Sequence, residues 1–159
     1  DPNFRSTHKE EALKLAPTII ENLEYAQIVR GSQADFFYMY NLLEADKIYK
    51  DKVKFYCPNF LCTAGSGQIA LRTHTISKEY TVPPLEAVST IGAGDNFNAG
   101  IIYGLLKHNI RYDDLNQMDE STWDKLVQYG MDFAAEVCKS FNNSVSKEFA
   151  EKLMLEKEI

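Results

Sequence analysis

The most informative stretch of the chain reads Ser89-Thr90-Ile91-Gly92-Ala93-Gly94-Asp95-Asn96-Phe97. It places a glycine-rich turn and a carboxylate directly before an apolar run that predicts a helix over Phe97–Lys107. Because glycine has no Cβ, Gly92 and Gly94 are expected to adopt positive φ and to let a ligand approach the backbone. The first amides of a helix lack partners within it, so such a turn is a ready site for a phosphate or another anion. Asp95 would lie at the edge of that site, where a carboxylate can accept a proton from an attacking hydroxyl.

Asp95 also has an ordinary structural interpretation, because many glycine-rich turns are plain helix starts in which an aspartate caps the helix. Two other phosphate motifs are excluded. The dinucleotide fingerprint needs a third glycine where Phe97 stands, and the Walker loop needs Gly-Lys-Ser/Thr, which the chain lacks. The spacing alone leaves both an anion site and a structural cap open.

The segment Thr90–Phe97, together with Gly100, closely resembles the carboxy-terminal signature of ribokinase-like (PfkB) carbohydrate kinases, which usually reads Asp-Thr-x-Gly-Ala-Gly-Asp-x-Phe. Three further segments resemble family elements and follow the family's order. Asp1–Arg5 resembles a strand end of fructokinase-type members, Arg30–Asp35 lies where the family commonly has Asn-x-x-Glu, and Leu61–Gly67 resembles its Thr-x-Gly-x-x-Gly turn. The resemblance covers nearly all 159 residues but only about the second half of such an enzyme.

The resemblance implies an α/β fold, namely the carboxy-terminal portion of a parallel-sheet ribokinase-like core with helices on both faces. Strand–helix alternation along the chain is typical of such sheets. We expect residues 1–159 to form a single nucleotide-binding and catalytic portion, with the preceding half of the kinase absent and little activity from this portion alone. Because ligands of such sheets bind at the carboxyl ends of the strands, the four matching segments are expected to line one edge.

The resemblance gives the signature turn a catalytic role. Asp95 would take the proton of a sugar hydroxyl, and it would also contact the sugar itself. An anion hole for the transferring phosphate would be formed by the amides of Gly92, Ala93 and Gly94. The position of Ser89 usually holds an aspartate in the family, so activation by a monovalent cation is doubtful here.

Five residues are implied to bind the ATP cofactor: Ser32, Thr63, Gly65, Gly67 and Asn143. Each has a structural alternative. The Thr-Ala-Gly-Ser-Gly run is also typical of a hairpin turn, and Asn142 and Asn143 are also typical of a helix C-cap.

Asp35 matches the family's Glu and is implied to order Mg²⁺ near the phosphates, since Mg²⁺ keeps several waters and takes few protein ligands. Ser32 replaces the usual Asn of that element, and Asp35 is equally expected to cap the next helix. Asn3 and Arg5 are implied to contact the sugar; a plain surface arginine is an equal alternative for Arg5.

The composition is that of an ordinary globular protein, with 45% hydrophobic and 25% charged residues. The formal charge of −6 argues against a nucleic-acid or anionic-membrane partner, and no apolar run approaches a membrane span. Three cysteines do not suggest a disulfide framework, so we expect buried thiols in a reducing, cytoplasmic compartment.

The expected partners are the sugar and ATP, with a homodimer left open. A non-catalytic nucleotide-binding or regulatory module of the same fold is the alternative function.

Several further elements are expected from local patterns. Ile69–His74 and Ser77–Val82 predict a hairpin or two short strands. Gly100 and Gly104 lie four residues apart on one helix face, and close packing against a neighbour is the expected reason. The remaining expected elements are strands at Tyr25–Arg30 and Phe55–Thr63, helices at Asp35–Leu43, Glu44–Val53, Trp123–Phe141 and Ser144–Leu155, and a loop at Arg111–Met118.

Overall fold

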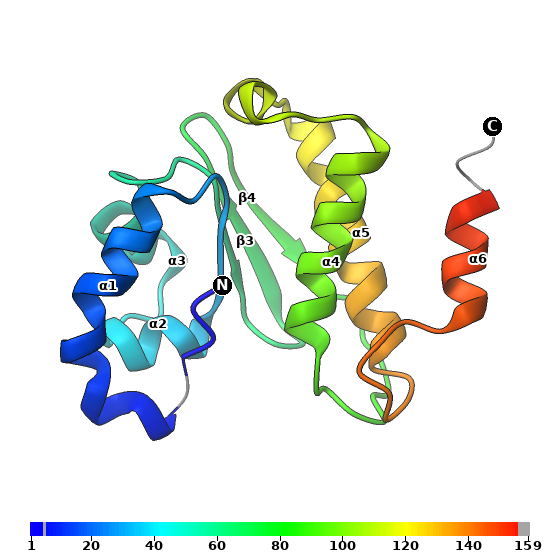
Figure 1. Ribbon diagram of the computed structural model, residues 1–159, viewed down its shortest axis with the longest axis horizontal. Helices are drawn as coiled ribbons and strands as arrows, with labels where there is room; N and C mark the ends of the chain where they lie inside the picture. Colours follow the sequence, from blue (N-terminus) through cyan, green and yellow to red (C-terminus); the bar gives the residue numbers. More distant parts are fainter. Residues whose placement is uncertain (5, 156–159) are drawn as a thin grey trace. The chain divides into compact units, whose positions relative to one another are not determined.

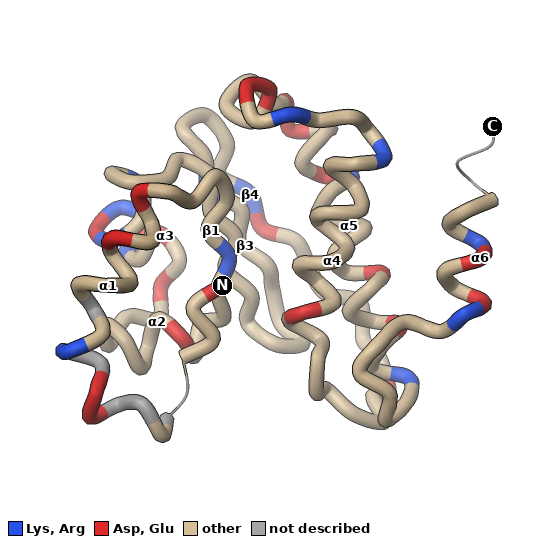
Figure 2. Tube along the Cα trace, in the orientation of Figure 1, with Lys and Arg blue, Asp and Glu red and all other residues tan. Residues whose placement is uncertain are grey.

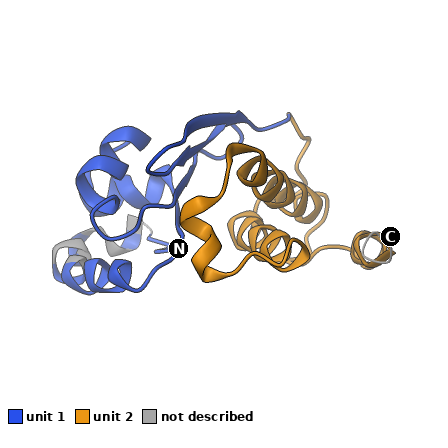
Figure 3. Cartoon of the chain, turned by 90° about the horizontal axis from the view of Figure 1, so that it is seen from above, with its two compact units in different colours: residues 1–83 blue, residues 84–159 orange. Residues whose placement is uncertain are grey.

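The computed structural model describes residues 1–4 and 6–155 (Figure 1). The chain forms two compact units, Asp1–Pro83 and Pro84–Ile159 (Figure 3). Acidic and basic residues occur along the trace of both units (Figure 2). Each unit is described by itself.

The first unit contains a four-stranded sheet with strand order β1-β2-β3-β4. Its strands are β1 (Val29–Ser32), β2 (Phe60–Thr63), β3 (Gln68–Arg72) and β4 (Ser77–Thr81). The expected α/β class is confirmed, but the sheet is mixed, because β1 and β2 are parallel whereas β2–β3 and β3–β4 are antiparallel. The short turn after β2 is the physical reason, since a parallel return needs a crossover of a dozen or more residues. The hairpin of β3 and β4 is confirmed.

The helices of the first unit are η1 (Ser6–Glu11), α1 (Ala12–Glu24), α2 (Gln33–Tyr40), α3 (Ala45–Ile48) and the π-helix η2 (Tyr49–Val53). Apolar residues of α1, α2, α3 and η2 form one core with β1, β2 and Ala70 of β3. The ring of Phe60, which is fully buried in this core, packs edge-on against Phe36 and stacks on Tyr49, with distances between ring centroids of 5.4 Å and 5.9 Å. Residues 1–4, expected to end a strand, belong to no strand of the described sheet.

The second unit contains α4 (Ala93–Lys107), the 3₁₀-helix η3 (Tyr112–Gln117), α5 (Glu120–Val137) and α6 (Lys147–Leu155). Helices α4 and α5 pack through glycines. A Cβ at Gly100 would overlap the carbonyl oxygen of Tyr129 and would lie 2.7 Å from Cα of Gly130. A Cβ at Gly104 would lie 2.6 Å from Cδ2 of Leu126. The expected close packing at Gly100 and Gly104 is confirmed.

The cysteines Cys57, Cys62 and Cys138 are free and buried, which confirms the expectation of buried thiols. Burial raises the pKa of the Cys62 thiol to about 11. Among the helices that the structure describes, none combines the length and the apolar composition needed to cross a membrane.

Candidate active site

The signature turn leads directly into α4. Gly92 is the N-cap of this helix and has a φ of 80°, the left-handed region that favours glycine. A positive φ at Gly92 is therefore confirmed. For Gly94 the same expectation is wrong, because the helix begins at Ala93 and Gly94 already has helical backbone.

The amides of the signature turn are partly open. The Ala93 amide donates to the carbonyl of Thr90 at 3.3 Å, and the Asn96 amide donates to the carbonyl of Gly92 at 2.9 Å. The amides of Gly94 and Asp95 donate to no acceptor in the part of the chain that the structure describes. Open amides at the positive end of a helix suit an anion.

Asp95 is the third residue of α4, and it is exposed. It does not cap the helix, because the N-cap is Gly92 and no side chain makes a cap hydrogen bond. Its carboxylate makes no hydrogen bond or ion pair with any residue that the structure describes. The structural-cap alternative is therefore wrong, and both carboxylate oxygens can meet a ligand.

Asn96 was not expected to matter, yet it holds the signature turn. Its side chain is 9% exposed, and Nδ2 donates to the carbonyls of Gly92 at 2.9 Å and of Asn143 at 3.2 Å. This places Asn143 beside the turn, with its own side chain exposed. The C-cap alternative for Asn143 is wrong, because the C-cap of α5 is Cys138. A signal for Asn96 was present, since Asn is a poor helix former and its use in a first turn indicates a polar partner.

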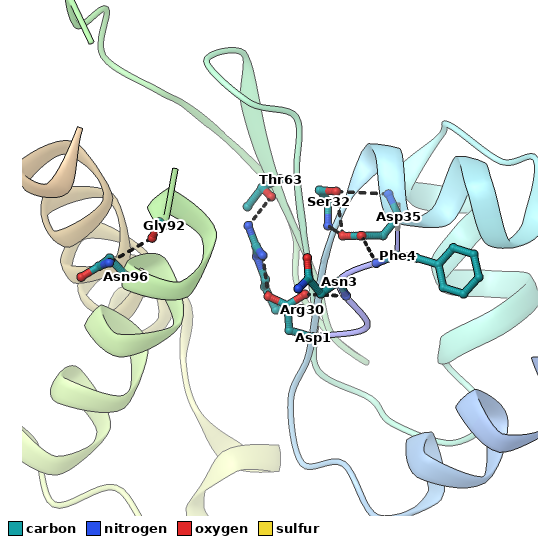
Figure 4. A network of polar contacts seen from close by, with 9 residues as sticks. All are labelled: Asp1, Asn3, Phe4, Arg30, Ser32, Asp35, Thr63, Gly92 and Asn96. Atoms are coloured by element: carbon teal, nitrogen blue, oxygen red, sulfur yellow. Dashed lines mark hydrogen bonds and ion pairs between the residues drawn. The ribbon is translucent and has the colours of Figure 1, made fainter. Parts of the chain in front are cut away.

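In the first unit, Asp35 lies in a capping box at the start of α2. The N-cap Ser32 accepts the Asp35 amide at 3.1 Å, and Oδ2 of Asp35 accepts both the Ser32 amide at 2.6 Å and the Ser32 hydroxyl at 2.7 Å. Oδ1 accepts the Phe4 amide at 2.6 Å (Figure 4).

Asp35 is 5% exposed, and both its oxygens are occupied by these hydrogen bonds. Among the described residues, no group of three or more His, Cys, Asp or Glu side chains is arranged to hold a metal ion. The geometry is that of a helix capping box, as expected for the structural alternative; that Asp35 also helps to order Mg²⁺ and its waters stays a prediction.

The glycine turn after β2 is a hairpin turn. The Ala64 amide donates to the carbonyl of Gln68 at 2.9 Å, and the Gly67 amide donates to the carbonyl of Ala64 at 3.0 Å. Gly65 has a φ of 57°, and a Cβ there would meet nothing within 4 Å. Ala64–Gln68 is exposed, so the turn is open to a ligand.

Thr63, Arg30 and Asp1 form a polar network at the other predicted segments of the first unit. Arg30 contacts the carboxylate of Asp1 and the hydroxyl of Thr63, each at 2.7 Å (Figure 4). Asn3 has a φ of 46°, and its amide donates to Oδ1 of Asp1 at 3.2 Å. Arg5 lies outside the described residues. The structure thus joins Asn3, Thr63 and the hairpin turn within one unit, and the signature turn with Asn143 within the other.

A family model described as "pfkB family carbohydrate kinase" matches residues 1–149. The match includes all four segments on which the resemblance rests. No curated protein matches the chain in sequence.

Solved structures of sugar and nucleoside kinases are similar to the chain. A fructokinase from Vibrio cholerae O395, bound to fructose, ADP and calcium ion, has a TM-score of 0.69 and 19% identity over 82% of this chain and 41% of that chain. A fructokinase from Xylella fastidiosa with bound ATP has a TM-score of 0.75 and 17% identity, covering 91% and 47%. An aminoimidazole riboside kinase from Salmonella enterica, complexed with aminoimidazole riboside and an ATP analog, has a TM-score of 0.66 and 16% identity, covering 90% and 46%. At these identities the likeness establishes the fold, and the chain spans less than half the length of each of these structures.

Proposed function

Because the chain belongs to the pfkB family of carbohydrate kinases, we propose that it supplies the catalytic carboxylate of an enzyme that phosphorylates a sugar hydroxyl. The observation that carries the proposal is the exposed carboxylate of Asp95 beside open backbone amides. Its carboxylate is exposed, makes no hydrogen bond or ion pair with a described residue, and follows the open amide of Gly94 in the first turn of α4. A base and an anion site therefore stand side by side on one helix end.

Phosphoryl transfer requires positioning and charge neutralisation more than covalent participation by the protein. The sugar oxygen bonds to the γ-phosphorus of ATP as its proton passes to Asp95, while the bond between that phosphorus and the ADP oxygen breaks. The amides of Gly92 and Gly94, joined by that of Asp95, are proposed to donate to the oxygens of the transferring group. The Ala93 amide contributes less, because it already donates to Thr90.

ATP is the proposed phosphoryl donor and a fructose-like sugar the proposed acceptor. The nucleotides and the fructose in the similar fructokinase structures support these choices. The exposed turn containing Gly65 and Gly67, which Thr63 precedes, would approach the nucleotide phosphates. Asn143 would contact the adenine of the nucleotide. Asn3 would contact the sugar.

Magnesium is proposed to be held by the nucleotide phosphates and water, since Mg²⁺ is commonly bound through substrate phosphates with few protein ligands. There it would neutralise phosphate charge. Asp35, whose carboxylate accepts hydrogen bonds from Phe4 and Ser32, is proposed to act on the metal through its water ligands.

Replacing Asp95 tests the mechanism. Asp95→Asn in the complete protein keeps the size of the side chain but cannot accept the proton. General-base catalysis contributes about 10²–10⁴ in rate, so kcat should fall by that factor. ATP affinity, measured by calorimetry, and thermal stability should stay close to those of the parent, because the exposed Asp95 side chain makes no hydrogen bond or ion pair with a described residue.

Asp113→Asn is the matched control, since Asp113 is an exposed aspartate in the first turn of η3 and should leave kcat unchanged. If Asp95→Asn retains kcat within a few-fold of the parent, Asp95 is not the base. If the parent binds ATP but phosphorylates no sugar, the non-catalytic nucleotide-binding module is the correct function.

A further inference from the structure

Arg30 joins two segments that are far apart in the sequence. It lies in β1, and its side chain is 12% exposed. Nη1 forms an ion pair with Oδ2 of Asp1 at 2.7 Å, and Nη2 donates to Oγ1 of Thr63 at 2.7 Å (Figure 4). The side chains of both acceptors are also shielded, Asp1 being 19% exposed at its side chain and Thr63 8% overall.

Each acceptor belongs to a segment with a proposed ligand. Asp1 accepts the amide of Asn3 at 3.2 Å, so the ion pair helps to fix Asn3, whose φ of 46° is uncommon for a non-glycine residue. Thr63 ends β2 and directly precedes the hairpin turn. The proposed sugar segment and the proposed nucleotide turn therefore meet at one side chain.

A guanidinium is suited to this task. It is planar and carries donors at fixed separation, so it sets both the distance and the angle between two acceptors. A lysine ammonium is a single point charge on a flexible stem, and it cannot reproduce a contact to both acceptors with the same geometry. Shielding from water makes such charge-assisted hydrogen bonds stronger than those on an open surface.

We propose that Arg30 is a positioning residue that holds the sugar-binding segment Asp1–Asn3 against the nucleotide-binding turn after Thr63. The inference rests on the proposed function, which assigns the two ligands. Arg30 acts here through its contacts with Asp1 and Thr63, so its loss should weaken the binding of sugar and of ATP together.

Hydrogen exchange followed by mass spectrometry tests the connection without any ligand. In the complete protein, Arg30→Met should accelerate exchange of the peptides containing Asn3 and Gly67, and should leave the peptides of α4 and α5 unchanged. Arg30→Lys keeps the charge but cannot hold both segments as the parent does, so exchange should rise in the peptide containing Asn3 or in the one containing Gly67. Asp1→Ala should loosen only the first segment, because the contact between Arg30 and Thr63 remains.

Arg72 provides the matched control. It also bridges two acidic residues in the same unit, Asp46 at 2.6 Å and Glu79, but contacts neither of the two segments. Arg72→Lys should lower the stability of the protein without selective exchange near Asn3 and Gly67. Arg30→Lys and Arg72→Lys thus compare two bridging arginines with the same substitution.

Kinetics separate positioning from a purely structural role. Loss of one charge-assisted hydrogen bond corresponds to roughly a tenfold change in an equilibrium constant. Arg30→Met should therefore raise KM for both sugar and ATP by about that factor. A structural role would instead lower the amount of active enzyme and leave both KM values unchanged. The inference is overturned if exchange rises uniformly through the first unit, or if Arg72→Lys gives the same pattern. A parent without sugar kinase activity would overturn the proposed function, whereas the exchange data would still decide whether Arg30 joins the two segments.

Discussion

At the scale of single residues, the conformation of the signature turn depends on Asn96. Its amide group donates to Gly92 and to Asn143, and it is nearly buried. Asn96→Ala removes the side-chain hydrogen bonds to both carbonyls. The Gly92 carbonyl keeps the backbone amide of residue 96, whereas the Asn143 carbonyl loses its side-chain donor, so we expect a loss of about 1–3 kcal/mol in the free energy of unfolding. Urea denaturation measures this change. Asn142→Ala is the control, because Asn142 is exposed and should change stability by less than about 0.5 kcal/mol. Equal stability of both variants would show that the Asn96 contacts are unimportant.

The same residues show how far sequence reasoning reaches at this scale. The positive φ of Gly92 follows from a glycine before an apolar helix, and it was predicted. The helical backbone of Gly94 was not predicted, because the pattern does not locate the first helical residue within the turn. The role of Asp35 could not be read from spacing, since a cap and a metal ligand use the same carboxylate. One contact of its carboxylate comes from the Phe4 amide, 31 positions away in the sequence.

At the scale of elements, the α4–α5 contact makes glycine essential at Gly100. Glycine to alanine in a helix interior normally stabilises by about 0.5–1 kcal/mol. At Gly100 the same substitution should instead lower the stability, because the new Cβ would overlap the backbone of Tyr129, which cannot move aside. We expect Gly100→Ala to destabilise by about 1–3 kcal/mol or more, as overpacking does. Gly104→Ala should cost less, because its new Cβ meets the side chains of Leu126 and Tyr129. Urea unfolding of both variants checks the order, and a more stable Gly100→Ala would contradict it.

Most element types were predicted, whereas their bounds and their helix subtypes were less well predicted. The strand expected at Tyr25–Arg30 lies at Val29–Ser32, because the following capping box fixes where the strand must end. The expected polar helix over Glu44–Val53 is α3 continued by the π-helix η2. A wider helical turn is not visible in hydrophobic periodicity. The expected loop over Arg111–Met118 contains η3, since its buried Leu115 gives the segment something to pack against.

At the scale of the whole molecule, an exposed segment connects the two units. On one side of it the Val82 amide donates to the carbonyl of Gly67 at 3.1 Å, and on the other the Val88 amide donates to the carbonyl of Cys138 at 2.8 Å. Residues 83–87 between them are exposed and have no regular structure. We expect a glutamate-specific protease to cut first after Glu86, and mass spectrometry of the early fragments identifies the site. Glu86→Gln should remove this early cut. A first cut inside a helix or strand of either unit would contradict the prediction.

The sheet and the division into units were the hardest features to predict. Alternation of strands and helices indicated a parallel sheet, and it is correct for β1 and β2. It does not hold for β3 and β4, because each follows its predecessor after too short a turn for a crossover. The boundary near Pro83 carries a local signal in the Pro83-Pro84 pair, but compactness depends on contacts between distant residues and cannot be read from that pair alone.

Alkylation of the three buried thiols can report the unfolding of the protein. Cys57 and Cys62 belong to one unit and Cys138 to the other. A thiol reacts with alkylating reagents as the thiolate, so with the pKa of Cys62 raised to about 11, it is nearly inert at neutral pH while its unit stays closed. Exposure to water returns the pKa toward its ordinary value of about 8.5 and opens access for the reagent. The order in which these cysteines become alkylated during heating therefore records which unit opens first, with no label added to the chain.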